Sequence, residues 1–123
     1  MPLSNLQWTQ LARNLPPPKR EPKLKHLRKG GRPRHDDRLC FEALLWLLAH
    51  GASWRRLPQD FGHRSTLHER ISQWAFSGLL ARLWIHYLSQ QSPNEIAFWK
   101  KCLRSRPKGH AFAVLETVTR IVL

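Results

Sequence analysis

The chain is poor in acidic residues, in cysteine and in long apolar runs. Cys40 and Cys102 are its two cysteines, too few and too far apart for a disulfide framework or a zinc knuckle, so both are predicted to be free thiols. The most apolar window, Ala43 to Ala49, is much shorter than the roughly 20 residues of a membrane-spanning helix. Met1 to Leu15 shows no signal-peptide pattern. These absences predict a soluble, cytoplasmic protein without a membrane partner.

Basic residues, by contrast, are abundant. Lys and Arg number 21 against eight Asp and Glu, a formal net charge of +13 that favours a polyanionic partner, nucleic acid first. A solvated surface is the alternative reading, but it seldom concentrates charge as residues 19–38 do. That segment carries Lys19, Arg20, Lys23, Lys25, Arg28, Lys29, Arg32, Arg34 and Arg38. A length of 123 residues allows one small domain with tails and no second, catalytic domain.

The first 35 residues divide into a helix and an arm. Ser4 and Gln7 have the spacing of a capping box, and apolar residues recur at helical intervals up to Leu15, so residues 1–15 are predicted to form an N-terminal helix. Residues 16–35 contain five prolines, two glycines and many cations with scarcely an apolar side chain. This composition predicts an extended basic arm.

Residues 36–90 are predicted to form the helical core. A first helix should start at its N-cap Asp36, end at Gly51 and bury Cys40, Ala43, Leu44, Leu47 and Leu48. Residues 57–62 favour one short helical turn. Ser65 is predicted to cap a second helix that buries Leu67, Ile71, Trp74 and Ala75. Two helices joined by a short, glycine-punctuated segment describe a helix-turn-helix unit.

A third long helix is predicted after Gly78, with an apolar stripe at Leu79, Leu80, Leu83, Trp84, Tyr87 and Leu88. Residues 91–123 form a C-terminal extension that opens with a capping signal at Ser92 to Glu95 and continues into a second basic cluster, Lys100, Lys101, Arg104, Arg106 and Lys108. Its last part, Ala111 to Leu123, is rich in β-branched residues and favours helix over strand only slightly, so it is predicted to be an irregular tail. The fold class is all-α.

Several segments match sequence motifs of a known family. These are residues 15–20 (LPPPKR), 31–38 (GRPRHDDR), 51–58 (GASWRRLP), Phe61-Gly62, and Ser65-Thr66 with Trp74. In order and spacing they resemble the N-terminal domain of insertion-sequence transposases of family five, within the four/five superfamily, over about residues 4–88. The resemblance implies binding to double-stranded DNA, at the ends of an insertion element, by a protein associated with the nucleoid.

Candidate DNA contacts fall in three places. On the arm, Lys29, Arg32 and Arg34 suit a narrow A·T-rich minor groove, or are a solvated linker. On the second helix, Thr66, Glu69, Arg70 and Gln73 are predicted to face base edges, with His63, Arg64 and Ser65 near phosphates at the helix start. In the turn, Arg55 and Arg56 are candidates for phosphate contacts or solvent. The family usually has several arginines along this helix, where this chain has Glu69, Ser72 and Gln73.

No catalytic or metal-binding residue is predicted. Asp36 and Asp37 suit a helix start better than a metal pair, and His63 and His68 have no further ligand at zinc-site spacing. In full-length members of the family, two aspartates and a glutamate of a later RNase H-like domain hold two divalent metals. No such carboxylate set follows residue 91, so the chain is predicted to be non-catalytic and without a cofactor, either a truncated remnant or the first of two frames joined by frameshifting.

Two other functions stay open. A basic, tryptophan-rich helical protein is also compatible with binding to structured RNA, although no RNA-recognition motif is present. An interaction module that pairs with an intact transposase, or with itself, as an inhibitor is the other alternative. In that case the stripe from Leu79 to Leu88 should be partly exposed in the monomer.

Overall fold

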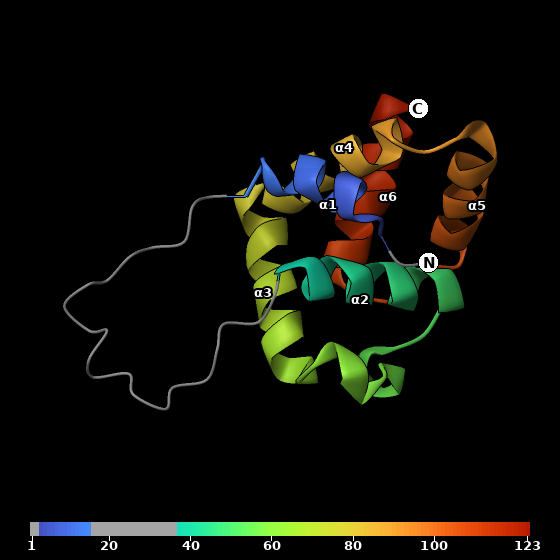
Figure 1. The fold of residues 1–123 in the computed structure, drawn as a ribbon. Helices are drawn as coiled ribbons and strands as arrows, with labels where there is room; N and C mark the ends of the chain where they lie inside the picture. Colours follow the sequence, from blue (N-terminus) through green and yellow to red (C-terminus); the bar gives the residue numbers. More distant parts are fainter. Residues whose placement is uncertain (1–2, 16–36) are drawn as a thin grey trace.

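The computed structural model describes residues 3–15 and 37–123. Within these residues it contains six α-helices, two short 3-10 helices and no strand, which confirms the all-α fold class (Figure 1). The elements are α1 (Asn5–Ala12), α2 (Asp37–His50), η3 (Trp54–Arg56), η4 (Gln59–Phe61), α3 (Arg64–Ser77), α4 (Leu79–Ser89), α5 (Pro93–Arg104) and α6 (His110–Val122). None of these helices combines the length and the apolar character that a membrane crossing requires.

The N-terminal helix α1 starts with the predicted capping box. The backbone N–H of Gln7 donates to Ser4 Oγ at 3.1 Å, and the backbone N–H of Ser4 donates to Gln7 Oε1 at 3.0 Å. Arg38 of α2 then holds this end of the chain, because its guanidinium donates to Asn5 Oδ1 at 2.8 Å and to the carbonyl oxygen of Leu3 at 2.5 Å. Residues 3–5 are thereby fixed to the first turn of α2.

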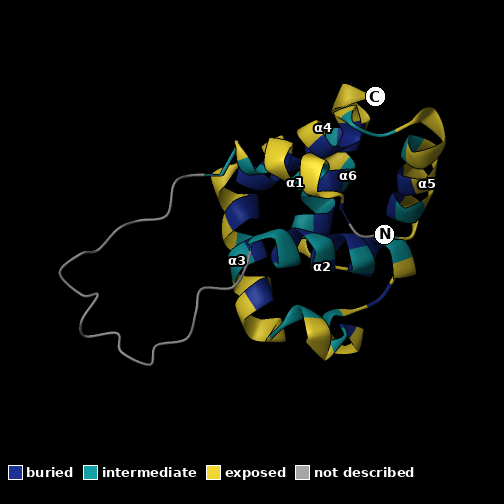
Figure 2. Cartoon of the chain, viewed as in Figure 1, coloured by how far each residue is buried: buried dark blue, intermediate teal, exposed yellow. Residues whose placement is uncertain are grey.

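Helix α2 lies in the middle of the core and ends at Gly51, whose φ of 57° only glycine adopts without strain. The five residues predicted to be buried are buried, and Phe41 and Leu45 are buried as well. The buried surface is wider than one stripe because α2 packs against α3 and α5, and η4 also packs on it (Figure 2). The predicted N-cap Asp36 lies outside the described residues.

Helices α3 and α4 are separated by Gly78 alone, in the left-handed conformation with φ 85°. The predicted stripe of α4 is fully covered, since none of its six residues is more than 7% exposed. The partial exposure that an inhibitor module would require of this stripe is therefore not observed. The neighbours α1, α3 and α6 cover it.

The connection between α2 and α3 differs from the predicted short turn. Residues 51–63 contain η3 and η4, whereas a helix-turn-helix usually has a turn of about 3–4 residues. The short helical turn predicted over residues 57–62 is present as η4. The predicted cap at Ser65 is wrong: the N-cap is His63, two residues earlier, its side chain makes no capping hydrogen bond, and α3 starts at Arg64.

The C-terminal extension is helical and part of the core. Helix α5 starts with the predicted cap, in which Ser92 Oγ accepts from the backbone N–H of Glu95 at 3.3 Å. Residues 111–122 are helical, as the sequence slightly favoured, and the predicted irregular tail is wrong: α6 packs against α3, α4 and α5 and buries Phe112 and Leu115. Packing has overridden the weak helix propensity of its β-branched residues, since apolar side chains at helical spacing meet an apolar partner surface.

Candidate nucleic-acid interface

The start of α3 is uncapped and exposed. The first backbone hydrogen bond of the helix runs from the N–H of Leu67 to the carbonyl oxygen of His63 at 3.0 Å, so the N–H groups of residues 64–66 precede it. Arg64, Ser65 and Thr66 are exposed, and no acidic residue lies in this first turn. Free N–H groups and the positive end of the helix dipole therefore face solvent, an arrangement that favours anions.

The 3-10 helix η3 places further cations beside this turn. Its neighbours Ala52 and Leu57 are buried, which holds the intervening Arg55 and Arg56 on the surface. The ring of Trp54 meets the ring of His68 edge to face, with centroids 5.1 Å apart. These two rings fix η3 against α3.

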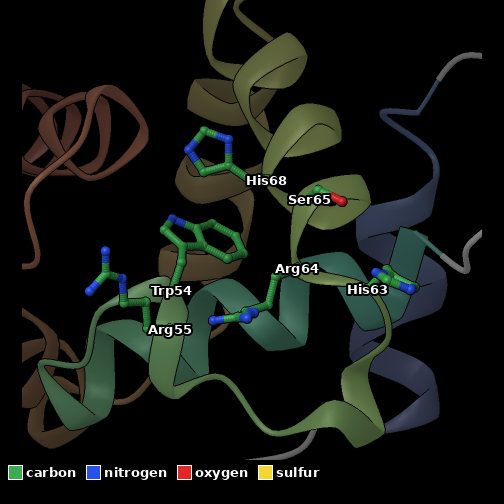
Figure 3. A pocket seen from close by; sticks show the side chains of 6 residues that line it. All are labelled: Trp54, Arg55, His63, Arg64, Ser65 and His68. Atoms are coloured by element: carbon green, nitrogen blue, oxygen red, sulfur yellow. The ribbon is translucent and has the colours of Figure 1, made fainter.

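An open pocket of about 380 Å³ lies between η3 and the start of α3. It is lined by Trp54, Arg55, His63, Arg64, Ser65 and His68. In Figure 3 the side chain of Arg64 extends toward Trp54, whereas His63 points away from it. The residues that line the pocket include two arginines and no carboxylate, so its electrostatic character suits a phosphate group.

The outer face of α3 carries the other residues that the sequence predicted to face DNA. Thr66, Glu69 and Gln73 are exposed, on the side opposite the buried residues Leu67, Ile71, Trp74 and Ala75. With Ser65, they form a polar face rich in hydrogen-bonding groups, which is the kind of surface that reads base edges. Glu69 adds one negative charge to this face.

Arg70 is placed differently from the other predicted contacts. Its guanidinium donates to Asp37 Oδ1 of α2 at 2.8 Å, and its side chain is only 18% exposed. This ion pair connects the middle of α3 to the first turn of α2. Arg70 therefore contributes first to the orientation of α3.

The predicted contacts on the arm, Lys29, Arg32 and Arg34, lie outside the described residues. Within residues 3–15 and 37–123, no three His, Cys, Asp or Glu side chains lie close enough together to hold a metal ion.

Sequence reasoning missed two aromatic contacts on α3. The pairing of His68 with Trp54, fourteen residues earlier, has no local sequence signal. Phe76 is 78% exposed near the end of α3 and stacks on His110 of α6 at a centroid distance of 4.5 Å. An aromatic residue among the polar residues of the outer face was the signal that could have drawn attention to Phe76.

These features define a small all-α protein with an arginine-lined surface at the start of one exposed helix. A family described as "Putative transposase of IS4/5 family" matches residues 3–84. The chain belongs to this family, which confirms the resemblance inferred from its motifs.

A curated relative adds little about function. "Uncharacterized protein y4sN" of Sinorhizobium fredii (strain NBRC 101917 / NGR234) is 40% identical over 53 residues, which are 42% of this chain and 42% of that protein. The chain thus matches less than half of the length of that relative. No solved structure matches this chain.

Proposed function

We propose that this chain is a DNA-binding module of an insertion-element transposase, and that it recognises element DNA through α3. The observation that carries the proposal is the uncapped start of α3, bordered by Arg55 and Arg64 and free of acidic residues in its first turn, in a member of a transposase family. Phosphate is the anion that duplex DNA offers at high density, about one charge per 1.7 Å of helix axis. The proposal assigns binding, and no chemical step, to this chain.

Different parts of α3 suit two kinds of DNA contact: phosphate contacts that position the helix, and base contacts that recognise the sequence. The first-turn N–H groups with Arg64, Arg55 and Arg56 would hold phosphates, as helix N-termini do in many DNA complexes. Thr66 in the first turn, with Glu69 and Gln73 further along the same face, would meet base edges in the major groove, which is about 12 Å wide and admits one α-helix. Arg70 supports this by fixing the angle of α3 through its ion pair with Asp37.

The arm adds a sequence-based part of the proposal. Lys29, Arg32 and Arg34 would contact phosphates or a narrow minor groove beside the site read by α3. Alanine at these three positions should weaken binding to every duplex, whereas alanine at Thr66 and Gln73 should change the preference among sequences. Equal losses on all duplexes in both variants would remove the reading role from α3.

The interaction module is the less favoured function. It required an apolar surface open to a partner, and the α4 stripe proposed for that role is buried. Co-purification of this chain with a full-length transposase would favour the interaction module again.

A competition titration tests the proposal. The purified chain is titrated with the terminal inverted repeat of its neighbouring element, a random duplex and a structured RNA, each at two salt concentrations. We expect a preference for the inverted repeat that persists at the higher salt, on top of a strongly salt-dependent affinity. Equal, salt-sensitive binding to all three polyanions would contradict it, because charge alone would then explain the binding.

A matched pair of variants assigns the contact to the surface. Arg55→Gln with Arg64→Gln should lower affinity and reduce the slope of log K against log salt by about 0.9 for each lost phosphate contact, roughly two units in all. The control is Arg13→Gln with Arg82→Gln, which removes the same charge from exposed arginines of α1's C-cap and α4. The control should change the slope much less. A similar change in both pairs would mean that net charge, and not this surface, binds DNA.

A further inference from the structure

The cations of the described residues form two groups. Four arginines have carboxylate partners: Arg38 with Glu42, Arg70 with Asp37, and both Arg106 and Arg120 with Glu116. Exposed cations without an ion pair to any described carboxylate include Arg55, Arg56 and Arg64, which with the outer face of α3 form the α3 interface, and Lys100, Lys101 and Arg104 on α5. The first group makes ion pairs within the protein, and the second group is exposed to solvent. The family match ends at residue 84, before α5 begins.

The outer face of α5 is cationic along its second half. Trp99 and Leu103 are buried, which turns Lys100, Lys101 and Arg104 to the surface. Glu95, the acidic residue of α5, lies in its first turn and contacts Ser92 Oγ at 3.3 Å, at the other end of the helix. Lys100 and Arg104 line a pocket with Glu116 of α6, whose carboxylate is paired with Arg106 and Arg120. Cations near a helix C-terminus offset the dipole, but the dipole is equivalent to only about half a charge, so three cations exceed that role.

Helix α2 connects this face to the α3 interface. At its first turn, Asp37 pairs with Arg70 of α3. The far end of α2 lies close to the end of α5. A Cβ atom added to Gly51, directly after α2, would lie 3.9 Å from the carbonyl oxygen of Ser105, directly after α5. The chain then leaves Gly51 and enters η3, which starts at Trp54. Figure 1 shows α2 extending from α3 at one end to α5 at the other.

The scale of this arrangement matches duplex DNA. The 14 residues of α2 span about 21 Å at 1.5 Å per residue. One turn of B-DNA is about 34–36 Å long. The two ends of α2, one beside the middle of α3 and the other beside the end of α5, are therefore less than one turn of a duplex apart.

We propose that the outer face of α5, through Lys100, Lys101 and Arg104, contacts the phosphodiester backbone of the same duplex beside the site held by α3. This inference rests on the proposed function and extends it to a segment outside the family match. The contact neutralises phosphates without reading bases, because lysine and arginine on an exposed helix face offer charge and no fixed complement to a base edge. It lengthens the bound segment and leaves the sequence preference unchanged.

The test measures how affinity depends on DNA outside the recognised site. The variant is Lys101→Gln with Arg104→Gln, and the control is again Arg13→Gln with Arg82→Gln, with equal loss of charge. Each protein is titrated with the inverted repeat alone and with the repeat extended by one helical turn on either side, over a range of salt. Unchanged thermal unfolding of both variants is checked first, since all four positions are exposed.

The wild type and the control should bind the extended duplex more tightly than the short one. The α5 variant should lose most of this gain, its salt slope on the extended duplex should fall by about 1.8 (0.9 per contact), and its preference for the repeat should be intact. If the α5 variant keeps the gain as the control does, α5 makes no DNA contact.

The same titrations separate this failure from a failure of the proposed function. If Arg55→Gln with Arg64→Gln weakens binding and the α5 variant behaves as the control does, α3 binds DNA and only the inference about α5 is overturned. If the wild type shows no preference for the repeat and all variant pairs behave alike, the proposed function and the inference fall together.

Discussion

Residues 3–84 and residues 85–123 differ in what they contribute. The first part matches the transposase family and contains the whole described α3 interface. The second part lies outside that match, yet its Trp99, Phe112 and Leu115 are each at most 1% exposed and belong to the same buried cluster as Phe41 and Leu67. The end of the sequence resemblance is therefore not the end of the core, and the interface stands on a scaffold that the C-terminal helices complete.

The two parts meet in an aromatic cluster. The ring of Trp84 lies 5.5 Å from Tyr87 and 5.9 Å from Trp99, centroid to centroid. Trp84 Nε1 donates to Thr119 Oγ1 of α6 at 2.8 Å, a buried hydrogen bond. Burial raises the pKa of Tyr87 to about 12, so the phenol stays neutral at all ordinary pH values. The last residue of the family match is thus enclosed by α5 and α6.

Deletion of residues 110–123 should cause the largest loss of stability, because it removes α6 from the core that the two parts share. Without α6, Trp84 loses its hydrogen-bond acceptor and the apolar side of α4 becomes exposed, so the chain should lose its cooperative thermal transition and its near-ultraviolet circular dichroism. Deletion of Ile121 to Leu123 alone is the control, because these residues are 43–78% exposed. A cooperative transition in the longer deletion would show that residues 3–109 fold independently.

Thr119→Val should cause the second-largest loss of stability. Valine keeps the shape of threonine but leaves the buried Trp84 Nε1 without its acceptor, at a cost of about 1–3 kcal/mol of unfolding free energy. Denaturant unfolding measures it. Thr117→Val, at an exposed position of the same helix, is the matched control and should change little. Equal effects of the two substitutions would mean that helix propensity, and not the hydrogen bond, is responsible.

Arg70→Ala should separate structural from DNA-facing cations on α3. The ion pair with Asp37 is half-buried, with side-chain exposures of 18% and 40%, so its loss should cost about 1 kcal/mol. Asp37→Ala should cost a similar amount, and the double variant should cost less than the sum. Arg64→Ala should leave unfolding unchanged and weaken only DNA binding. Equal stability losses for Arg64→Ala and Arg70→Ala would contradict this division.

Glu116→Gln should have the smallest effect, confined to acid pH. The hydrogen bond from Arg106 lowers the pKa of Glu116 below its ordinary value of 4.5, and Arg120 lowers it further. The stabilisation is therefore complete above about pH 5 and is lost as the pH falls below 4.5 toward the lowered value. The wild type should lose slightly more stability than Glu116→Gln between pH 5 and pH 3 in thermal melts. If the melting temperatures of the wild type and of Glu116→Gln fall in parallel with pH, the ion pairs of Glu116 do not stabilise the position of α6.

Local chemistry predicted most of the helices. The capping pairs Ser4 with Gln7 and Ser92 with Glu95 mark the starts of α1 and α5, and Gly51 and Gly78 mark the ends of α2 and α3, because caps and left-handed glycines act within one turn of the chain. The predicted N-cap of α3, Ser65, lies two residues after the observed one, His63, since serine also fits inside a first turn. The exposed face of α3 followed correctly from helical periodicity.

The sequence by itself determined most of the helices, the excess of positive charge and the family, because these depend on local spacing, composition and short motifs. Tertiary structure decided which cations serve the fold, since Arg70 meets Asp37 across 33 positions of sequence. It also decided that η3 lies against α3 and that the β-branched last segment is a helix. These outcomes depend on which surfaces meet, and burial against a partner surface outweighs the local preferences of a few residues.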